Sequence, residues 1–239
     1  EEIASYYITK GAVVVMNVET GDIKASVSLP SFSPLNIAQS INDENQPFVN
    51  RVFSAYNVGS TFKVCVAAAA LEAGISPALT YTCEGYYEMG QQRYYCHNRN
   101  GHGTLDLLGG LEHSCNPYFI NLGQRVGSSR LLEMAYNMGF GNATKLSEGM
   151  IAAKGNLPAA SQVSIGELAN LSFGQGQLTA TPVQIAQMIS CIANGGNSVI
   201  PTLVEGITDE TGTQMAQYEP VYGSTRAISK STADRIAMF

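Results

Sequence analysis

The chain has 239 residues, 45% hydrophobic and only 13% charged, so it can form one domain with a real core and is not a disordered chain. Its net charge of −6 and pI near 5.0 leave no basic patch for nucleic acid, and no apolar run reaches membrane-spanning length. It starts Glu-Glu-Ile, with neither a start methionine nor a signal peptide, so we expect an excised piece of a longer protein.

The first predicted elements are two strands that form a hairpin. Residues 11–18 are a continuous apolar run typical of a buried strand, and residues 23–29 alternate as a second strand. Residues 19–22 (Glu-Thr-Gly-Asp) supply the turn between them. A segment with two prolines ends the hairpin at residues 30–34, and a polar loop follows to residue 47.

The only Ser-x-x-Lys of the chain is Ser60-Thr61-Phe62-Lys63, which is followed by an apolar run typical of a buried helix. On a helix this spacing puts Ser60 and Lys63 on one face. Burial and the positive helix end both disfavour the ammonium form of a lysine there, so a neutral amine can take the proton of a serine nucleophile. The alternative is an N-cap serine beside a lysine whose amine extends to solvent.

Residues 80–103 have little core pattern of their own and are rich in Tyr, Gly, Cys and His. Beyond them the sequence predicts a succession of short helices. Thr104 is expected to cap a helix through Leu111, and Ser128 one through Met138. Between these two, Pro117 suits the first position of a helix that runs to about Val126.

The C-terminal third is predicted to alternate irregular segments with one strong helix and two strands. Residues 140–162 read as irregular, and Thr181-Pro182 opens a helix to Asn194. The remaining predicted elements are strands at about 199–207 and 213–218 and a helix at 230–239. This order predicts an α+β fold, in which the first and last strands meet in an antiparallel sheet flanked by helices and an all-helical subdomain is inserted between them.

Ser114-Cys115-Asn116 lies in a tight loop between two predicted helices. A hydroxyl and a carboxamide two residues apart can face one cleft, so Ser114 could relay a proton and Asn116 could hold a substrate amide. The pattern alone is weak, because Ser40-Ile41-Asn42 also fits it. The alternative is that Asn116, which precedes Pro117, is simply a helix cap.

Four segments together resemble the transpeptidase domain of class B penicillin-binding proteins, which belong to the penicilloyl-serine transferases. They are Gly-Ala-Val-Val-Val-Met-Asn-Val-Glu-Thr-Gly-Asp-Ile with Pro-Ser-Phe after it, Gly-Ser-Thr-Phe-Lys, His-Ser-Cys-Asn-Pro-Tyr-Phe, and Phe-Gly-Gln-Gly-Gln-Leu-Thr-Ala-Thr-Pro-Val-Gln-Ile-Ala. The resemblance covers nearly the whole chain. It matches Ser60 and Lys63 to the family's first motif, and Ser114 and Asn116 to its second.

The resemblance implies a D,D-transpeptidase that needs no cofactor for catalysis. Ser60 would attack peptidoglycan stem peptides that end in D-Ala-D-Ala, and β-lactam antibiotics would acylate the same serine. It also implies a membrane-embedded glycosyltransferase partner and a place on the outer face of the bacterial cytoplasmic membrane. The anchor would be an N-terminal segment that is absent from this chain.

One family motif, Lys-Thr/Ser-Gly on a strand at a sheet edge, is missing from residues 1–239. Lys230-Ser231-Thr232 lacks the glycine and lies in a predicted helix. The motif normally follows the helix at which this chain ends. We therefore expect residues 1–239 to form a single transpeptidase domain that is incomplete on its C-terminal side, with the strand located beyond Phe239.

Cys83, Cys96, His102 and Cys115 offer the three thiolates and one imidazole of a tetrahedral structural zinc site. Such a site would tie the Ser-x-Asn loop to residues 83–102, and some elongation-type members of the family carry a zinc near the same place. The rival interpretation is a Cys83–Cys96 disulfide. Cys65 and Cys191 lie on apolar helix faces and are expected in the core.

Two further functions share the first motif. A serine β-lactamase needs a deacylating base, and Glu167-Leu168-Ala169-Asn170 only faintly matches the acid-and-asparagine motif of one class. A β-lactam sensor or a catalytically inactive scaffold of the cell-wall machinery needs no turnover. The response to penicillin separates these alternatives.

Overall fold

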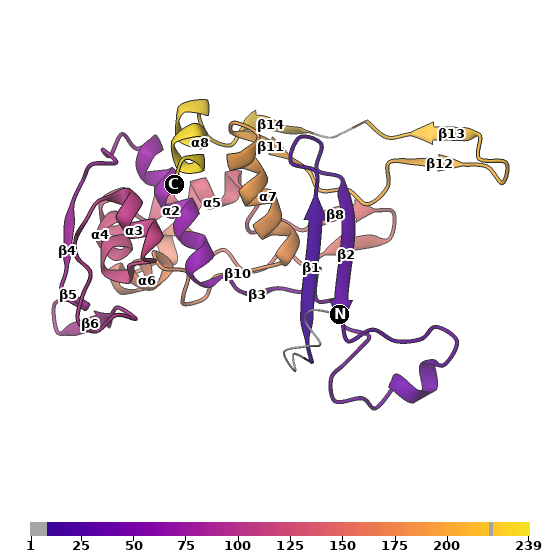
Figure 1. The fold of residues 1–239 in the computed structure, drawn as a ribbon, viewed down its shortest axis with the longest axis horizontal. Helices are drawn as coiled ribbons and strands as arrows, with labels where there is room; N and C mark the ends of the chain where they lie inside the picture. The colour runs from indigo at the N-terminus through magenta and orange to yellow at the C-terminus, as the bar shows by residue number, and fades with distance from the viewer. Residues whose placement is uncertain (1–8, 220–221) are drawn as a thin grey trace.

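The computed structural model describes residues 9–219 and 222–239 (Figure 1). The helices are α2 Lys63–Glu72, α3 Leu107–Glu112, α4 Asn116–Val126, α5 Ser128–Asn137, α6 Ile165–Leu171, α7 Pro182–Ala193 and α8 Lys230–Ala237, with 3-10 turns η1 Ile37–Ser40, η2 Gly59–Phe62 and η3 Ala160–Gln162. The strands are β1 Gly11–Met16, β2 Ile23–Leu29, β3 Tyr56–Asn57, β4 Tyr81–Cys83, β5 Tyr86–Met89, β6 Gln92–Tyr95, β7 Gly103–Leu105, β8 Thr144–Ser147, β9 Met150–Ala152, β10 Thr179–Ala180, β11 Asn197–Val199, β12 Gly206–Thr208, β13 Gln214–Gln217 and β14 Tyr222–Arg226.

The β1–β2 hairpin is antiparallel, with Gly11 opposite Leu29, as the sequence predicts. One face of β1 packs on α7, where Val14 lies against a small core around Val183. Val13 and Val15 point the other way and are exposed, so the prediction of a fully buried strand was wrong. The reason is that α7 covers only one face of the hairpin, and in the described ranges β1 pairs with β2 alone.

Helix α2 is the centre of the main core (Figure 1). Its residues from Cys65 to Ala70 are all buried, and α4, α5 and α8 pack around it. Four successive alanines allow these neighbours to approach closely on every side. The apolar run after Lys63 is therefore a buried helix, as predicted, and it ends before Gly74, whose φ of +76° suits glycine.

The region inserted between the first and last strands, here called the inserted region, carries short strands as well as helices. This corrects the expectation of an all-helical subdomain. Strands β4 and β7 pair with each other, as do β5 and β6, within residues 81–105. Tyr and Thr side chains in these segments favour extended backbone. Because β7 occupies Thr104, the cap of α3 is Asp106, whose carboxylate accepts from the Gly109 N–H.

Helix α6 is an element that the sequence analysis missed. A capping box begins it: the Ser164 hydroxyl accepts from the Glu167 N–H, and the Glu167 carboxylate accepts from the Ser164 N–H at 2.7 Å. The Ser-x-x-Glu signal was present in the sequence. Residues 144–152, predicted irregular, form the β8–β9 hairpin.

Among the described residues, the N-terminal hairpin meets the C-terminal segment through an isolated parallel bridge between Asp22 and Thr202 and an ion pair between Lys24 and Glu205. Strands β11 and β14 pair beside α7, and β12 and β13 form a hairpin that projects from the molecule (Figure 1). The α+β fold class is confirmed, although within the described residues the strands pair only two by two. None of the helices in the described part of the chain is long and apolar enough to cross a membrane.

Candidate active site

Ser60 lies in the 3-10 turn η2, directly before α2. Its side chain makes no capping hydrogen bond, and the residue is exposed. Gly59, with φ of +63°, turns the chain into η2, and its N–H donates to the Gly174 carbonyl at 2.9 Å. In a 3-10 turn residues three apart eclipse each other, so Lys63 stands directly over Ser60.

Lys63 is only 2% exposed, and its amine is surrounded by oxygen atoms. Nζ lies 3.1 Å from Ser60 Oγ, 2.9 Å from Ser114 Oγ, 2.7 Å from the Ser114 carbonyl and 2.7 Å from Asn116 Oδ1. Burial lowers the pKa of Lys63 from its usual 10.5 to about 8, although nearby thiol groups oppose the shift. At pH 7 about a tenth of the amines are then neutral, far more than for an exposed lysine with the usual pKa.

These four contacts suit a neutral amine. The carbonyl of Ser114 and Oδ1 of Asn116 can only accept, so they take both protons of a neutral amine at the two shortest distances. In the ammonium form Nζ donates to the hydroxyl oxygens of Ser60 and Ser114, and on loss of one proton its lone pair becomes available to one of these hydroxyls. A lone pair directed at Ser60 Oγ is what a general base requires.

The loop of Ser114 to Asn116 presents both polar side chains to Lys63 while the thiol of Cys115 is buried away from it. Ser114 has φ of +47°, an unusual backbone conformation for a non-glycine residue. Asn116 opens α4, and its Nδ2 donates to the Tyr95 carbonyl at 3.2 Å. This bond fixes which end of the carboxamide faces the amine.

The structure thus brings Ser60, Lys63, Ser114 and Asn116 together around one amine. Two supporting residues were missed by the sequence analysis. Tyr95 orients Asn116 through a main-chain atom, which leaves no side-chain signature. Gly174 lies against the backbone of Gly59. The only feature of the sequence that pointed to Gly174 was its place in the Gly-x-Gly loop of residues 174–176.

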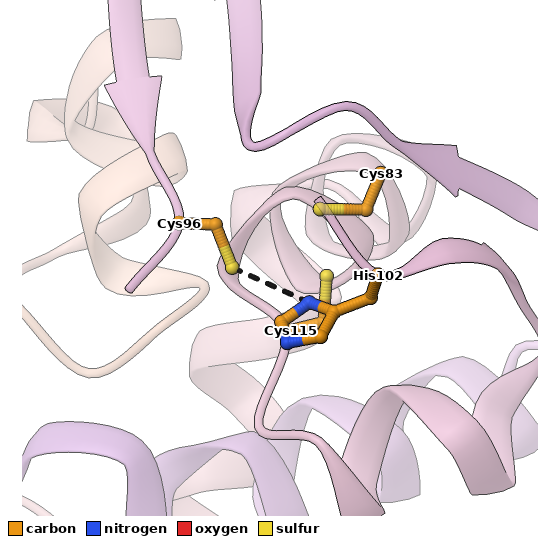
Figure 2. Close-up of side chains that lie close together, drawn as sticks. All are labelled: Cys83, Cys96, His102 and Cys115. Atoms are coloured by element: carbon orange, nitrogen blue, oxygen red, sulfur yellow. Dashed lines mark hydrogen bonds between the residues drawn. The ribbon is translucent and has the colours of Figure 1, made fainter. Parts of the chain in front are cut away.

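Cys83, Cys96, His102 and Cys115 also come together, beside the loop of Ser114 (Figure 2). Their ligand atoms all lie within 4.8 Å of one another, and His102 Nδ1 is 3.5 Å from Cys96 Sγ. All five cysteines of the chain are free thiols, and no Cys83–Cys96 disulfide is formed. Cys65 and Cys191 are buried in the core, as predicted.

Glu167, the candidate acid of a β-lactamase, has a structural role. Its carboxylate is engaged by the backbone and hydroxyl of Ser164 in the capping box, and these bonds lower its pKa. A deacylating base needs a free lone pair and a raised pKa. The resemblance to an acid-and-asparagine motif is therefore explained by the cap of α6.

An exposed serine hydroxyl beside a buried lysine amine at the start of the central helix is the arrangement of serine acyl-transfer proteins. The model of the penicillin binding protein transpeptidase domain matches residues 11–238. The chain belongs to the penicillin-binding protein transpeptidase family.

Two curated relatives illustrate this kinship. Stage V sporulation protein D of Bacillus subtilis is 31% identical over 98% of this chain and 36% of its own length. Peptidoglycan D,D-transpeptidase MrdA of Escherichia coli is 30% identical over 89% of this chain and 36% of its own length. The chain thus spans about a third of the length of these relatives.

Solved structures agree. Penicillin-binding protein A of Mycobacterium tuberculosis, in a penicillin G acyl-enzyme complex, matches with a TM-score of 0.87 and 27% identity over 95% of this chain and 55% of that one. A chain of a peptidoglycan synthase complex that coordinates polymerization and crosslinking matches with a TM-score of 0.82 and 29% identity, over 95% of this chain and 41% of that one.

Proposed function

We propose that the protein is a peptidoglycan D,D-transpeptidase whose nucleophile is Ser60. The observation that carries this proposal is the amine of Lys63, buried between the hydroxyls of Ser60 and Ser114. The membership of the chain in the transpeptidase family and the acyl-enzyme of its structural neighbour support it.

In the first step Ser60 Oγ attacks the carbonyl carbon of the penultimate D-Ala of a donor stem peptide. Lys63 Nζ takes the hydroxyl proton, and the amide C–N bond to the last D-Ala breaks. The hydroxyl of Ser114, 2.9 Å from Nζ, passes a proton to the departing amine. The result is an ester on Ser60, free D-Ala, and no net change in protons.

In the second step an amine of a neighbouring stem peptide attacks the ester. Its proton returns through Ser114 and Lys63 to Ser60 Oγ as the ester C–O bond breaks. Asn116 has one amide hydrogen left to hold the donor backbone, since Nδ2 carries two hydrogens and donates one to the Tyr95 carbonyl. A β-lactam would acylate Ser60 by the first step alone and leave its opened ring attached.

The oxyanion that forms in both steps needs two N–H donors. The backbone N–H of Ser60 supplies one, and we assign the other to a Lys-Thr/Ser-Gly strand outside residues 1–239. A groove of about 520 Å³ beside β1 supports this assignment. Ala12, Val14, Tyr56, Val58 and Thr61 are among its lining residues, so a strand in it would run along β1 to the flank of Ser60.

Labelling with fluorescent penicillin tests the proposed function. We expect a stable label that is lost in Ser60→Ala, together with turnover of a D-Ala-D-Ala donor and an acceptor amine. Rapid release of the label would instead identify a β-lactamase. Stable labelling without donor turnover would identify a sensor, and no labelling an inactive scaffold.

We further propose that Cys83, Cys96, His102 and Cys115 hold a structural zinc ion. Sulfur atoms around tetrahedral zinc lie close to 4 Å apart, and the four ligand atoms lie within 4.8 Å. The cysteines are free, and burial lowers the pKa of His102, which favours the neutral imidazole that binds metal. The ion would supply a rigid link between Cys115 and the hairpins of residues 83–102.

Metal analysis of the purified protein tests this site. We expect about one zinc per chain, and loss of the metal in Cys115→Ser. Cys191→Ala is the matched control, because Cys191 is a buried cysteine of the core outside the cluster. Zinc-free protein with Cys83 and Cys96 crosslinked would decide for the disulfide.

The setting of the reaction follows from its substrate. Peptidoglycan stem peptides lie outside the cytoplasmic membrane of bacteria, so we place the domain on that outer face, anchored by a segment that precedes it. We also propose a membrane-embedded glycosyltransferase partner, which polymerises the strands that Ser60 crosslinks, in cell shape maintenance or division. The structural likeness to a chain of a peptidoglycan synthase complex supports this partner.

A further inference from the structure

One arginine of the inserted region lies unpaired next to the active site. The guanidinium of Arg99 lies over the ring of Tyr95, with Cζ 4.0 Å from the ring centroid. Arg99 makes no ion pair among the residues that the structure describes. In a chain with a net charge of −6, an exposed cation without an ion pair in the described part of the chain is available to a ligand.

The backbone around Arg99 is fixed. Asn98 Nδ2 donates to the Gly101 carbonyl at 2.7 Å and closes a tight turn. Gly85 lies so close that a Cβ there would come within 2.1 Å of the Arg99 carbonyl oxygen. The His102 N–H donates to the Cys83 carbonyl and fastens the end of the turn. This turn fixes the backbone of Arg99, and the ring of Tyr95 favours a guanidinium position over it before any ligand arrives.

Short contacts connect Arg99 to the reacting groups. Tyr95, whose ring is under the guanidinium, accepts through its carbonyl from Asn116 Nδ2 at 3.2 Å. The other end of that carboxamide, Oδ1, lies 2.7 Å from Lys63 Nζ. The nitrogen of Asn116 therefore faces Tyr95. The same Tyr95 presents a half-exposed ring with Arg99 over it, so this ring and guanidinium lie one residue from the nitrogen that would hold a donor peptide.

We propose that Arg99 and Tyr95 form a subsite that binds a carboxylate on the acyl part of the donor peptide. The guanidinium fork matches the two oxygens of a carboxylate, and the ring of Tyr95 covers the apolar part of the same side chain. This inference rests on the proposed function of Ser60 and Asn116, and it adds a preference for acidic donors that neither residue supplies.

The test compares three penicillins that differ only at the side-chain carbon next to the phenyl ring, which carries hydrogen, an ammonium group or a carboxylate. The measured quantity is the acylation rate constant of the carboxylate form divided by that of the hydrogen form. We expect Arg99→Ala to lower this ratio about fivefold, Arg99→Glu to lower it by roughly tenfold or more, and Arg99→Lys to retain part of it. The ammonium form should show the opposite trend.

Arg93→Ala is the matched control, because Arg93 also lies over a tyrosine ring but already pairs with Glu88 at 3.4 Å. Its ratio should equal that of the wild type. A ratio that stays the same in both Arg99→Ala and Arg99→Glu, or that falls equally in Arg93→Ala, overturns the subsite.

A second arm separates this proposal from the proposed function. Non-covalent binding of the same three compounds is measured by ligand-observed NMR in Ser60→Ala, with and without Arg99→Ala. Suppose that no penicillin acylates the wild type, but that Arg99→Ala still weakens non-covalent binding of the carboxylate form. In that case the subsite stands and the transpeptidase assignment falls. If acylation proceeds and neither arm depends on Arg99, the subsite falls alone.

Discussion

Opposing effects act on the pKa of Lys63. Burial lowers it, whereas negative charge on Cys115 or Cys96 would raise it, and the face of Phe119 at 5.8 Å also favours a cation. Burial is the largest effect, and the pKa settles at about 8. The spacing of Ser60 and Lys63 was readable from the sequence, but this balance was not, because Cys96, Cys115 and Phe119 are far from Lys63 along the chain.

Asn116→Asp tests the balance at Lys63. A carboxylate at the position of Oδ1, 2.7 Å from Nζ, would favour the ammonium form and return its pKa towards 10.5. Each unit by which the pKa of Lys63 rises lowers the neutral fraction of its amine about tenfold at neutral pH. We therefore expect acylation by benzylpenicillin to slow by about a hundredfold. Stopped-flow or gel-based labelling measures the rate.

Asn121→Asp is the control, since it adds the same charge to the same helix where the carboxamide only accepts from Arg125. It should leave the acylation rate within about twofold of the wild type. Equal rates in Asn116→Asp and Asn121→Asp would show that the amine of Lys63 is not the base.

At the scale of single elements, local sequence signals predicted some helices correctly and did not reveal others. Thr181-Pro182 predicted α7, and its capping box with Gln184 is present. The Ser-x-x-Glu box of α6 was equally visible, but no long apolar period followed it, so the short helix was missed. Strands β4 to β7 were missed because each has at most four residues, and their stability comes from pairing and from packing on α3 and α4 that the local sequence does not show.

The turn that presents Ser60 depends on Gly174. A Cβ at position 174 would lie 1.7 Å from the Gly59 carbonyl oxygen, and φ at this residue is +77°. Gly174→Ala must therefore move backbone, and we expect it to cost about 3 kcal/mol of unfolding free energy and to slow acylation of Ser60. Urea unfolding and penicillin labelling measure the two effects.

Gly149→Ala gives the matched comparison for the backbone conformation alone. Gly149 has φ of +74° in the β8–β9 turn, and a Cβ there meets no atom within 4 Å. Its substitution should cost about 1 kcal/mol and leave acylation intact. If Gly174→Ala and Gly149→Ala lower the free energy of unfolding by the same amount, the close contact between Gly174 and Gly59 does not support the site.

At the scale of the whole molecule, the cluster of Cys83, Cys96, His102 and Cys115 joins two parts of the inserted region. Cys83, Cys96 and His102 come from the hairpins of residues 81–105, and Cys115 comes from the loop before α4. Both parts also meet at the bond between Asn116 and Tyr95. The sequence predicted that these four side chains come together, but not this second connection, which passes through a main-chain carbonyl.

Removal of the proposed zinc should loosen this junction. We expect a strong chelator to lower the Tm by on the order of 10 °C, because the binding energy of a structural metal adds directly to the free energy of unfolding. Differential scanning calorimetry measures the shift, and added zinc should reverse it. An unchanged Tm after verified metal removal would mean that the cluster contributes nothing to stability.

The pH dependence of Ser60 acylation by benzylpenicillin tests the central claim most directly. The base is active only when neutral, so with a pKa of about 8 the rate should rise about tenfold per pH unit below pH 8 and level off above it. Lys63→Arg, which keeps the charge but cannot lose a proton, should abolish the reaction. A rate that is flat across this range, or that rises only near pH 10.5, would contradict the assignment of Lys63 as the general base.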